Sequence, residues 1–345
     1  MFNYMCCPTG LEWTSNISPR RANTTYVCSG GAGLIFRKGR GSIRLSVNIK
    51  RLFVFVLGLS VTAGCLTGGA GAGAVPAELS GRPGFDPFLR ASLLSGPTTQ
   101  VPWQNDPAFN AAKKENGCTA LLAAYKTVLR DPLPGEEGNV HLAARYIRGA
   151  LVPPGETFSQ NETAGPYTAE RGYDSGPTYM GTLYSETIGG GVCKIASTLF
   201  NVAVLSDLAI VERHTHSMPV PYVPYGQDAT VYYGAKDLKF KNTTGAPILI
   251  WAEGIDNILY IGFYGQSVPP ELVWHHDVLN VYRAPVVYRD NTKLPKGTEH
   301  VLHEGMDGAA IRSWITRFHS DGTSDVREMG THYYNPLSWI IERNN

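Results

Sequence analysis

The chain has 345 residues, with 30 Lys and Arg against 29 Asp and Glu, and 43% of its residues are apolar. This charge balance excludes a strongly basic nucleic-acid-binding protein, and the apolar content is sufficient for a hydrophobic core. The 38 glycines and 23 prolines exclude a helical bundle or a coiled coil. No apolar run reaches the ~18 residues that a membrane-spanning helix needs.

A secretory signal peptide is predicted at residues 47–74. Lys50 and Arg51 precede a short apolar run, Leu52–Val61, which is followed by small residues up to Ala74. Cleavage after Ala74 would release the protein, whereas cleavage before Cys65 would leave a lipid anchor. Thr62 stands where a lipoprotein signal usually has Leu or Val, so release is favoured. We therefore expect an extracytoplasmic protein, secreted or associated with the cell wall or membrane.

Residues 1–46 do not fit a signal peptide, which should begin the chain. We interpret them as an N-terminal extension that results from a start codon assigned too early, with initiation near Val47. The mature chain then keeps two cysteines, Cys118 and Cys193, besides Cys65 if that residue is lipidated. We expect these two not to form a stable disulfide.

Two helices are predicted after a Pro-, Gly- and Ser-rich linker at 75–105. Asp106 and Pro107 have the residue types of an N-cap and of a first helical position, and Asn139 is a second N-cap. Apolar residues at helical spacing follow each of these starts. They are Cys118, Leu121, Leu122, Tyr125, Val128 and Leu129 in the first helix, and Val140, Ala143, Ala144, Ile147 and Leu151 in the second.

The rest of the chain combines one strong helix with short strands. Residues 192–206 are apolar and free of Gly and Pro, so they predict a helix. Strand-like segments follow at 210–217, 229–233, 238–241, 248–252 and 258–264, and residues 253–257 predict a hairpin between the last two. The predicted class is α+β: a few helices packed on a mostly antiparallel sheet at 106–268, followed by a small all-β tail at 280–345. Asp321-Gly322 predicts a hairpin turn in that tail, and His275-His276-Asp277 is interpreted as a solvated connector.

Cys193 is the candidate nucleophile. It follows Gly189-Gly190-Gly191-Val192 and lies in the first turn of the predicted helix, where the helix dipole favours a thiolate. The N–H groups of Gly190 and Gly191 are candidates for holding an oxyanion. A packing cysteine is the alternative interpretation of this motif.

Two histidines are candidates for the base. In a strand, Glu212, His214 and His216 would share one face. We expect His216 to be the base, because it lies nearer the strand end, and His214 to hold the loop. Asp228 is a candidate for orienting the imidazole. A zinc site built from Cys193, His214 and His216 is an alternative, and an ordinary polar strand face is another.

Arg171, in Glu170-Arg171-Gly172-Tyr173, is a candidate for binding a substrate carboxylate, and an ordinary surface ion pair is the alternative.

Several motifs together resemble the VanW family. They are Leu151-Val152-Pro153-Pro154-Gly155-Glu156-Thr157-Phe158-Ser159, Gly165-Pro166, Thr168–Tyr173, Gly189–Cys193, Ser197-Thr198-Leu199, Glu212-Arg213-His214, His216-Ser217, Asp228-Ala229-Thr230-Val231, Phe240-Lys241-Asn242 and Pro247–Ile250. The resemblance covers about residues 110–265. The tail, with Leu294–Thr298, Glu304-Gly305 and Gly308, resembles a partial G5-type β module.

The resemblance implies a role in the bacterial cell wall, because the family is bacterial and mostly extracytoplasmic. It also implies that the protein is similar to L,D-transpeptidases, since some members of the family are enzymes of this kind. The family's cysteine corresponds to Cys193 and its histidines to His214 and His216. The family usually has Gln after the cysteine, where this chain has Lys194, so Lys194 would have to help hold the oxyanion as a cation.

We therefore expect a cysteine-dependent acyl transferase that acts on peptidoglycan stem peptides, with no cofactor, no bound metal and no nucleic-acid partner. A non-catalytic peptidoglycan-binding or assembly protein of the vancomycin-resistance accessory type is the first alternative. A zinc-dependent peptidase or amidase is the second. The membrane would be contacted only through the signal peptide or an anchor at Cys65.

Overall fold

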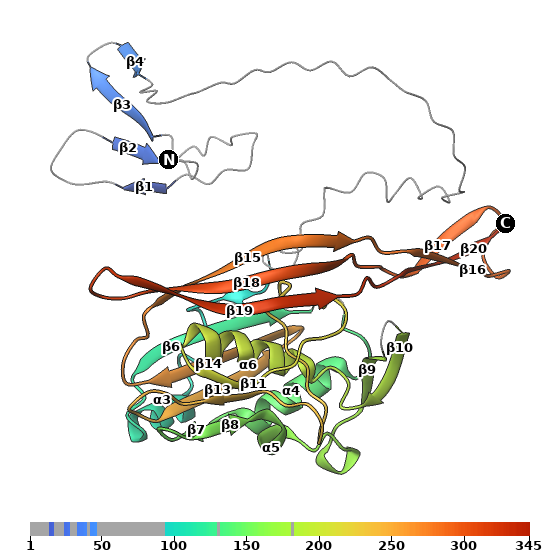
Figure 1. Ribbon diagram of the computed structural model, residues 1–345, viewed down its shortest axis with the longest axis horizontal. Helices are drawn as coiled ribbons and strands as arrows, with labels where there is room; N and C mark the ends of the chain where they lie inside the picture. The colour runs from blue at the N-terminus through green and yellow to red at the C-terminus, as the bar shows by residue number, and fades with distance from the viewer. Residues whose placement is uncertain are drawn as a thin grey trace. The chain divides into compact units, whose positions relative to one another are not determined.

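The computed structural model describes residues 94–129, 132–180 and 183–345, together with four strands near the N-terminus (Figure 1). Two compact units are present, residues 1–72 and 73–345. The expected signal peptide, Cys65 and most of the linker lie outside the described residues. Within the described part of the chain, no helix is long and apolar enough to cross a membrane.

The first unit contains one antiparallel sheet with its strands in sequence order. The strands are β1 (Thr14–Asn16), β2 (Thr24–Val27), β3 (Gly33–Gly39) and β4 (Ser42–Ser46).

The second unit is built on a five-stranded antiparallel sheet. Its strands, in spatial order, are β5 (Gly96–Pro97), β6 (Ala120–Val128), β14 (Ile258–Gly265), β13 (Ile248–Ile255) and β7 (Leu151–Val152). The expected hairpin at 253–257 joins β13 to β14. Asp256 takes φ +49° in the turn, a conformation that Asp tolerates better than most residues.

Four α-helices are described. They are α3 (Pro107–Glu115), α4 (Glu136–Ile147), α5 (Gln160–Ala164) and α6 (Cys193–Leu205), and a 3₁₀ turn spans Ala169–Arg171. As expected, α3 begins at Asp106, whose side chain accepts from two backbone N–H groups, and at Pro107. The second helix begins three residues before the expected N-cap Asn139, after Gly135.

The expected continuation of the first helix through Cys118 and Leu129 is wrong. The helix ends at Glu115, Gly117 takes φ +65°, and residues 120–128 form β6. β6 pairs with β14 on one side and β5 on the other, and Ala124 and Tyr125 are both buried although they point to opposite faces. Burial on both faces removes the two-residue alternation that marks a strand.

A smaller sheet and a hairpin flank the helices. The sheet has the order β11 (Ala209–Glu212), β12 (Lys239–Lys241), β8 (Thr157–Ser159), and the hairpin joins β9 (Ser175–Met180) to β10 (Leu183–Ile188). The expected strand at 210–217 ends at Glu212, and the expected strand at 229–233 does not form. Between Glu212 and β12 there are only two isolated bridges, His214 to Thr230 and Tyr232 to Lys236.

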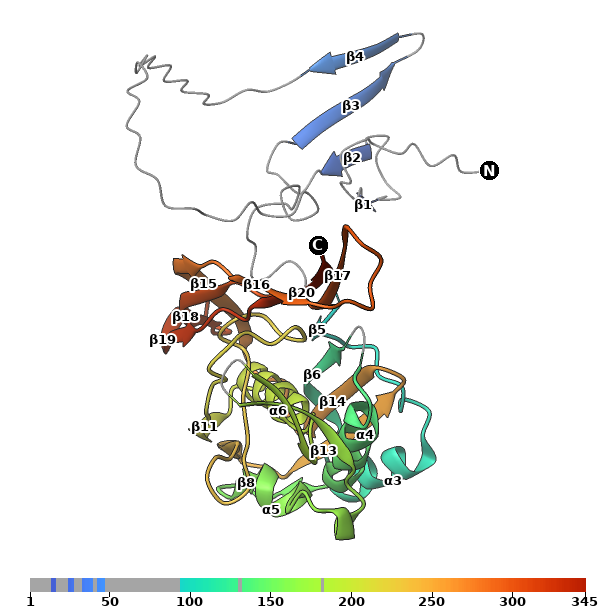
Figure 2. The same cartoon turned by 90° about the vertical axis from the view of Figure 1, so that its right-hand side faces the viewer.

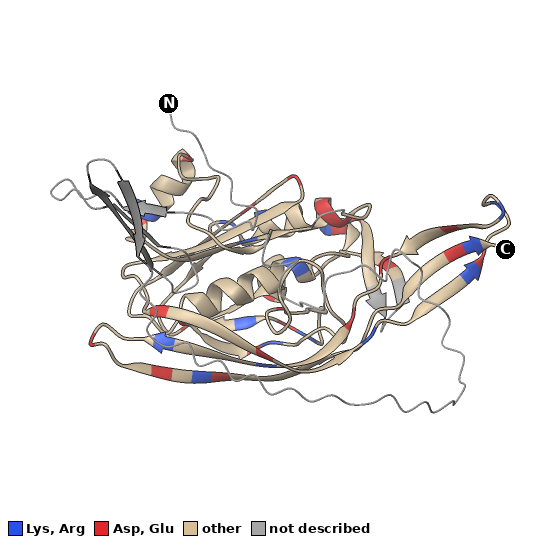
Figure 3. Cartoon of the chain, turned by 90° about the horizontal axis from the view of Figure 1, so that it is seen from above, with Lys and Arg blue, Asp and Glu red and all other residues tan. Residues whose placement is uncertain are grey.

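The C-terminal strands form two three-stranded sheets. One has the order β15 (Glu271–Tyr282), β18 (Gly308–Phe318), β19 (Ser324–Tyr334), and the other β16 (Val286–Asp290), β20 (Trp339–Asn344), β17 (Thr298–His303). Asp321 and Gly322 turn β18 into β19, as expected. Acidic and basic residues are interspersed along these strands (Figure 3). His275-His276-Asp277 is not a connector but the middle of β15.

Helix α6 lies between the five-stranded sheet and the sheet β15-β18-β19 (Figure 2). Most of its residues are buried in the main core, which also includes Ile315 of β18. Phe200 of α6 meets Trp274 of β15 edge to face, with ring centroids 5.6 Å apart. The predicted α+β class is confirmed, and the C-terminal strands share the core of the helical part.

Candidate active site

Polar residues of α6 hold a loop segment against the helix. Cys193, Ser197 and Asn201 follow one another at four-residue spacing and so lie on one face. Ser197 Oγ donates to the carbonyl of Ala229 at 3.0 Å and accepts from its N–H at 2.9 Å. Asn201 Nδ2 donates to the carbonyl of Gln227 at 2.8 Å. The segment 227–230 therefore runs along the helix toward Cys193.

Cys193, His216 and Asp228 form a hydrogen-bonded chain. Nδ1 of His216 lies 2.7 Å from Oδ2 of Asp228, which also accepts the backbone N–H of His216 at 2.7 Å. The His216 ring also hydrogen-bonds the Cys193 side chain. Sγ of Cys193 further lies 3.3 Å from Oγ1 of Thr230 and 3.6 Å from the carbonyl of Val231. The structure thus brings the expected nucleophile, base and orienting carboxylate together.

The electrostatic surroundings of Cys193 favour the thiolate form of its side chain. Burial opposes ionisation of Cys193, but the hydrogen bond and positive charge of His216 outweigh it, and the pKa of the thiol is lowered. Burial also opposes the charge on His216, yet Asp228 and Cys193 raise its pKa to about 9. Despite burial, His216 and Arg213 hold the pKa of Asp228 well below its usual range. The lowered pKa of Cys193 and the raised pKa of His216 both favour a thiolate beside an imidazolium.

Two further residues position Asp228, which is 1% exposed. The guanidinium of Arg213 donates to its carbonyl at 2.8 Å and to Oδ1 at 3.3 Å, and packs over the ring of Phe200. The hydroxyl of Tyr334, at the end of β19, donates to Oδ1 at 2.6 Å. A buried carboxylate needs such donors to stay ionised.

His214 takes a separate position. Its Nε2 lies 3.0 Å from Oε1 of Glu212, a carboxylate that also pairs with Lys239 at 2.9 Å. Its backbone carbonyl accepts from Thr230 at 2.8 Å, which holds the loop. The structure therefore does not assemble Cys193, His214 and His216 as ligands, and no group of three or more candidate metal ligands occurs among the described residues.

The glycines before α6 form a tight turn. The N–H of Gly190 donates to the carbonyl of Thr187 at 3.0 Å, so it is not free for an oxyanion, contrary to expectation. A side chain at Gly190 would lie 2.1 Å from the carbonyl oxygen of Gly176. Gly191 takes φ +100°. Among the described residues, none accepts a hydrogen bond from the N–H of Gly191 or Cys193, so these two groups remain the oxyanion candidates.

Lys194 and Arg171 are engaged elsewhere. Lys194 is buried and its Nζ donates to the carbonyl of Asn257 at 3.0 Å, in the turn between β13 and β14. Burial lowers the pKa of Lys194 to about 8, against the opposing charge of Glu136. The guanidinium of Arg171 packs over the ring of Tyr146, with 4.2 Å to the centroid. Neither cation is placed beside the Cys193 sulfur.

Sequence reasoning missed four residues of the site. Arg213 and Thr230 stand inside the quoted motifs, next to His214 and two residues after Asp228, so their motif positions were an available signal. Lys236, which lines the pocket beside His216, and Tyr334 lie outside every motif.

The site thus combines a cysteine at a helix start with a histidine and a buried aspartate on an α+β scaffold. This combination is typical of cysteine-dependent acyl-transfer sites and makes the site a candidate of that class. Residues 135–264 match the family model described as VanW like protein. Over this region the chain is similar to the VanW family.

Two curated relatives share part of the chain. It is 39% identical over 150 residues to the uncharacterized protein YoaR of Bacillus subtilis (strain 168), covering 44% of this chain and 50% of that protein. It is 34% identical over 141 residues to the vancomycin B-type resistance protein VanW of Enterococcus faecalis (strain ATCC 700802 / V583). This match covers 39% of this chain and 51% of that protein. The chain thus spans about half the length of these relatives.

Solved G5 domains are also similar to part of the chain. The IgA1 protease G5 domain matches with a TM-score of 0.15 and 19% identity, covering 22% of this chain and 92% of that one. The HP0197 G5 structure matches with a TM-score of 0.13 and 16% identity, covering 21% of this chain and 97% of that one.

Proposed function

We propose that this chain is an exported bacterial cell-wall protein whose VanW-like domain is a cysteine-dependent acyl transferase acting on peptidoglycan stem peptides. The observation that supports it best is the hydrogen-bonded chain Cys193–His216–Asp228. A packing cysteine would need neither a lowered pKa nor a buried histidine–carboxylate pair. Export is supported by the signal-like residues Lys50–Ala74.

In the acylation step the Cys193 thiolate attacks a peptide carbonyl. The negative charge moves to the carbonyl oxygen, within reach of the N–H groups of Gly191 and Cys193 at the positive end of α6. The intermediate then collapses to a thioester as the carbon–nitrogen bond breaks. The protonated His216 gives its proton to the departing amine, so the residue is released with a neutral amino group.

In the second step His216 acts as the base. It takes a proton from the amine of a neighbouring stem peptide while that amine attacks the thioester carbonyl. The carbon–sulfur bond breaks, a new peptide bond forms, and Cys193 returns as a thiolate beside the imidazolium. Asp228 keeps the His216 ring oriented in both steps through the 2.7 Å contact at Nδ1.

The comparison with a vancomycin B-type resistance protein supports a cell-wall substrate. The test is incubation of purified protein with a disaccharide-tetrapeptide, followed by mass spectrometry. We expect a covalent adduct and a cross-linked product with the wild-type protein and neither with Cys193→Ala. Binding of the same substrate by both proteins, with no adduct and no product, would instead establish a non-catalytic wall-binding protein.

A further inference from the structure

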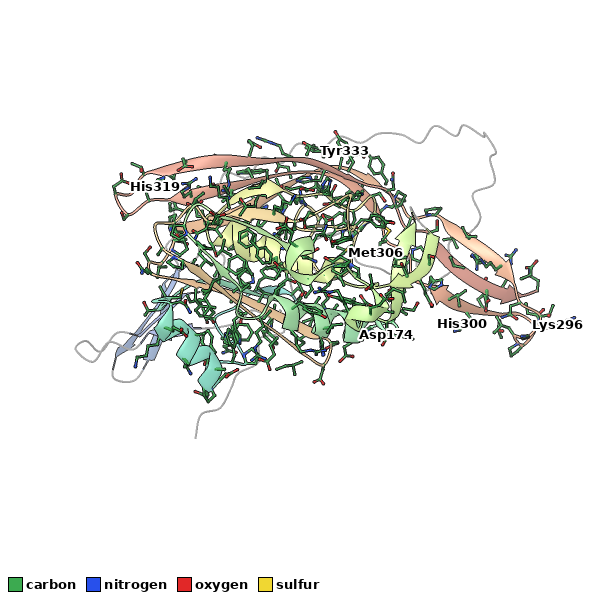
Figure 4. All side chains as sticks on the ribbon, turned by 90° about the horizontal axis from the view of Figure 1, so that it is seen from below. Asp174, Lys296, His300, Met306, His319 and Tyr333 are labelled. Carbon is green, nitrogen blue, oxygen red and sulfur yellow. The ribbon has the colours of Figure 1, made fainter. Side chains whose placement is uncertain are left out.

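A pocket of about 320 Å³ lies directly beside His216. It is lined by the loop Thr215-His216-Ser217-Met218, by Thr230 and Lys236, and by Tyr333 of β19. Tyr333 is exposed and lies on the C-terminal sheet (Figure 4). The volume is at the lower end of the ~300–1,000 Å³ typical of ligand sites. The pocket can therefore hold the end of a peptide but not a whole disaccharide-peptide.

The pocket opens next to the reactive sulfur. Two of its lining residues touch Cys193: Thr230, whose Oγ1 lies 3.3 Å from Sγ, and His216, which hydrogen-bonds it. A group bound in the pocket thus lies on the His216 side of the attacked carbonyl. His216 is also the group that must protonate the departing amine, so the departing residue has to lie on this side.

The charge of the pocket is positive. Lys236 lines it, and no Asp or Glu does. Within the described residues no carboxylate pairs with the Lys236 ammonium, whereas the nearby Lys239 is held by Glu212 at 2.9 Å. The backbone of Lys236 is fixed, since its N–H and carbonyl both bond to Tyr232 and the carbonyl also accepts from Asn161 at 2.8 Å. An unpaired ammonium on a fixed turn beside a reactive site is suited to bind an anion.

We propose that this pocket is the subsite for the departing residue and that Lys236 binds its free carboxylate. The substrate class is then a peptide whose scissile carbonyl is followed by a single residue with a free C-terminal carboxylate. Tyr333 covers that residue from the C-terminal sheet. This inference rests on the proposed function for the identity of the ligand, while the anion site itself is tested without turnover.

The first experiment compares two alkylating reagents at Cys193, anionic iodoacetate and neutral iodoacetamide. The ratio of their rates measures the attraction of a carboxylate to the site. We expect Lys236→Gln to lower this ratio about fivefold or more and Lys236→Arg to preserve it. Lys241→Gln, which removes an exposed lysine of β12 that does not line the pocket, should leave the ratio at the wild-type value. An unchanged ratio in Lys236→Gln would overturn the proposal.

The second experiment uses matched peptide substrates with a C-terminal acid or amide. We expect the wild-type protein to prefer the acid through its KM, and Lys236→Gln to lose that preference. If the wild-type protein turns over and Lys236→Gln keeps the full preference, the subsite is wrong while the acyl-transfer function stands. If the wild-type protein does not turn over but the alkylation ratio falls in Lys236→Gln, the anion site stands and the acyl-transfer function fails.

Discussion

The hydroxyl of Tyr334 donates to Oδ1 of Asp228 across 2.6 Å, and the two residues are 106 positions apart. Both side chains are buried, and burial holds the pKa of Tyr334 well above its usual value, so the phenol remains a neutral donor. Oδ2 of the same carboxylate faces His216. The C-terminal sheet therefore completes the support of the candidate active site.

Tyr334→Phe should slow alkylation of Cys193 about fivefold, which corresponds to the ~1 kcal/mol of one hydrogen bond. The reason is that Asp228 loses a donor that fixes its orientation toward His216. Tyr225→Phe is the matched control, because Tyr225 packs edge to face against Tyr334 but donates to the carbonyl of Asp307 instead. Its melting temperature should fall while its alkylation rate stays at the wild-type value. Equal slowing in both variants would argue for a purely structural role of Tyr334.

His216→Ala should slow alkylation of Cys193 by iodoacetamide at pH 6.5 at least ~tenfold, because the thiol pKa is lowered chiefly by that imidazole. His214→Ala should leave the rate unchanged. Its partner Glu212 keeps the ammonium of Lys239, and a half-exposed ion pair contributes under ~1 kcal/mol to the free energy of unfolding. Similar rate losses in the two variants would contradict the assignment of His216 as the base.

The two cysteines should differ in their pH dependence. The pKa of Cys193 is lowered, so its labelling by iodoacetamide should become fast at a lower pH than labelling of an ordinary cysteine. Cys118 is buried and burial raises its pKa, so it should label only after unfolding. Peptide mapping after a short pulse measures both. Rapid labelling of Cys118 in native protein would contradict the burial of its side chain.

Turnover should follow a bell-shaped pH profile although labelling does not. On the acid side the rate rises as Cys193 loses its proton. On the alkaline side it falls near pH 9, because His216 deprotonates there and can no longer protonate the departing amine. Iodoacetamide labelling needs no such acid and should not decline. A turnover profile that keeps rising through pH 10 would exclude His216 as the general acid.

Gly190→Ala should lower the free energy of unfolding by about 2 kcal/mol or more, since the added methyl would lie 2.1 Å from the backbone oxygen of Gly176. It should also slow Cys193 labelling, because the turn that begins α6 must shift. Gly245→Ala is the control, because nothing lies within 4 Å of a side chain there and its φ is not positive. Thermal melts and labelling rates of both variants check the expectation.

Local signals in the sequence determined several elements correctly. Asp106-Pro107 begins α3, the apolar residues 192–206 correspond to α6, and the turns at 253–257 and 321–322 join antiparallel strands. Each of these depends on neighbouring residues alone: a side-chain cap, an unbroken apolar helix or a two-residue turn. The candidate Cys193, His216 and Asp228 were found in the same way, from residue types at a helix start and on a strand-like segment.

Only the tertiary structure decided what depends on distant partners. Residues 118–129 match a helical spacing, yet β14 and β5 bind the backbone of β6 on both sides, and pairing with strands outweighs a weak local preference. Lys194 follows Cys193 in the chain, but the helix turns its side chain to Asn257. Tyr334 reaches Asp228 only because the C-terminal sheet packs on α6, and no local pattern encodes a contact between residues so far apart in the chain.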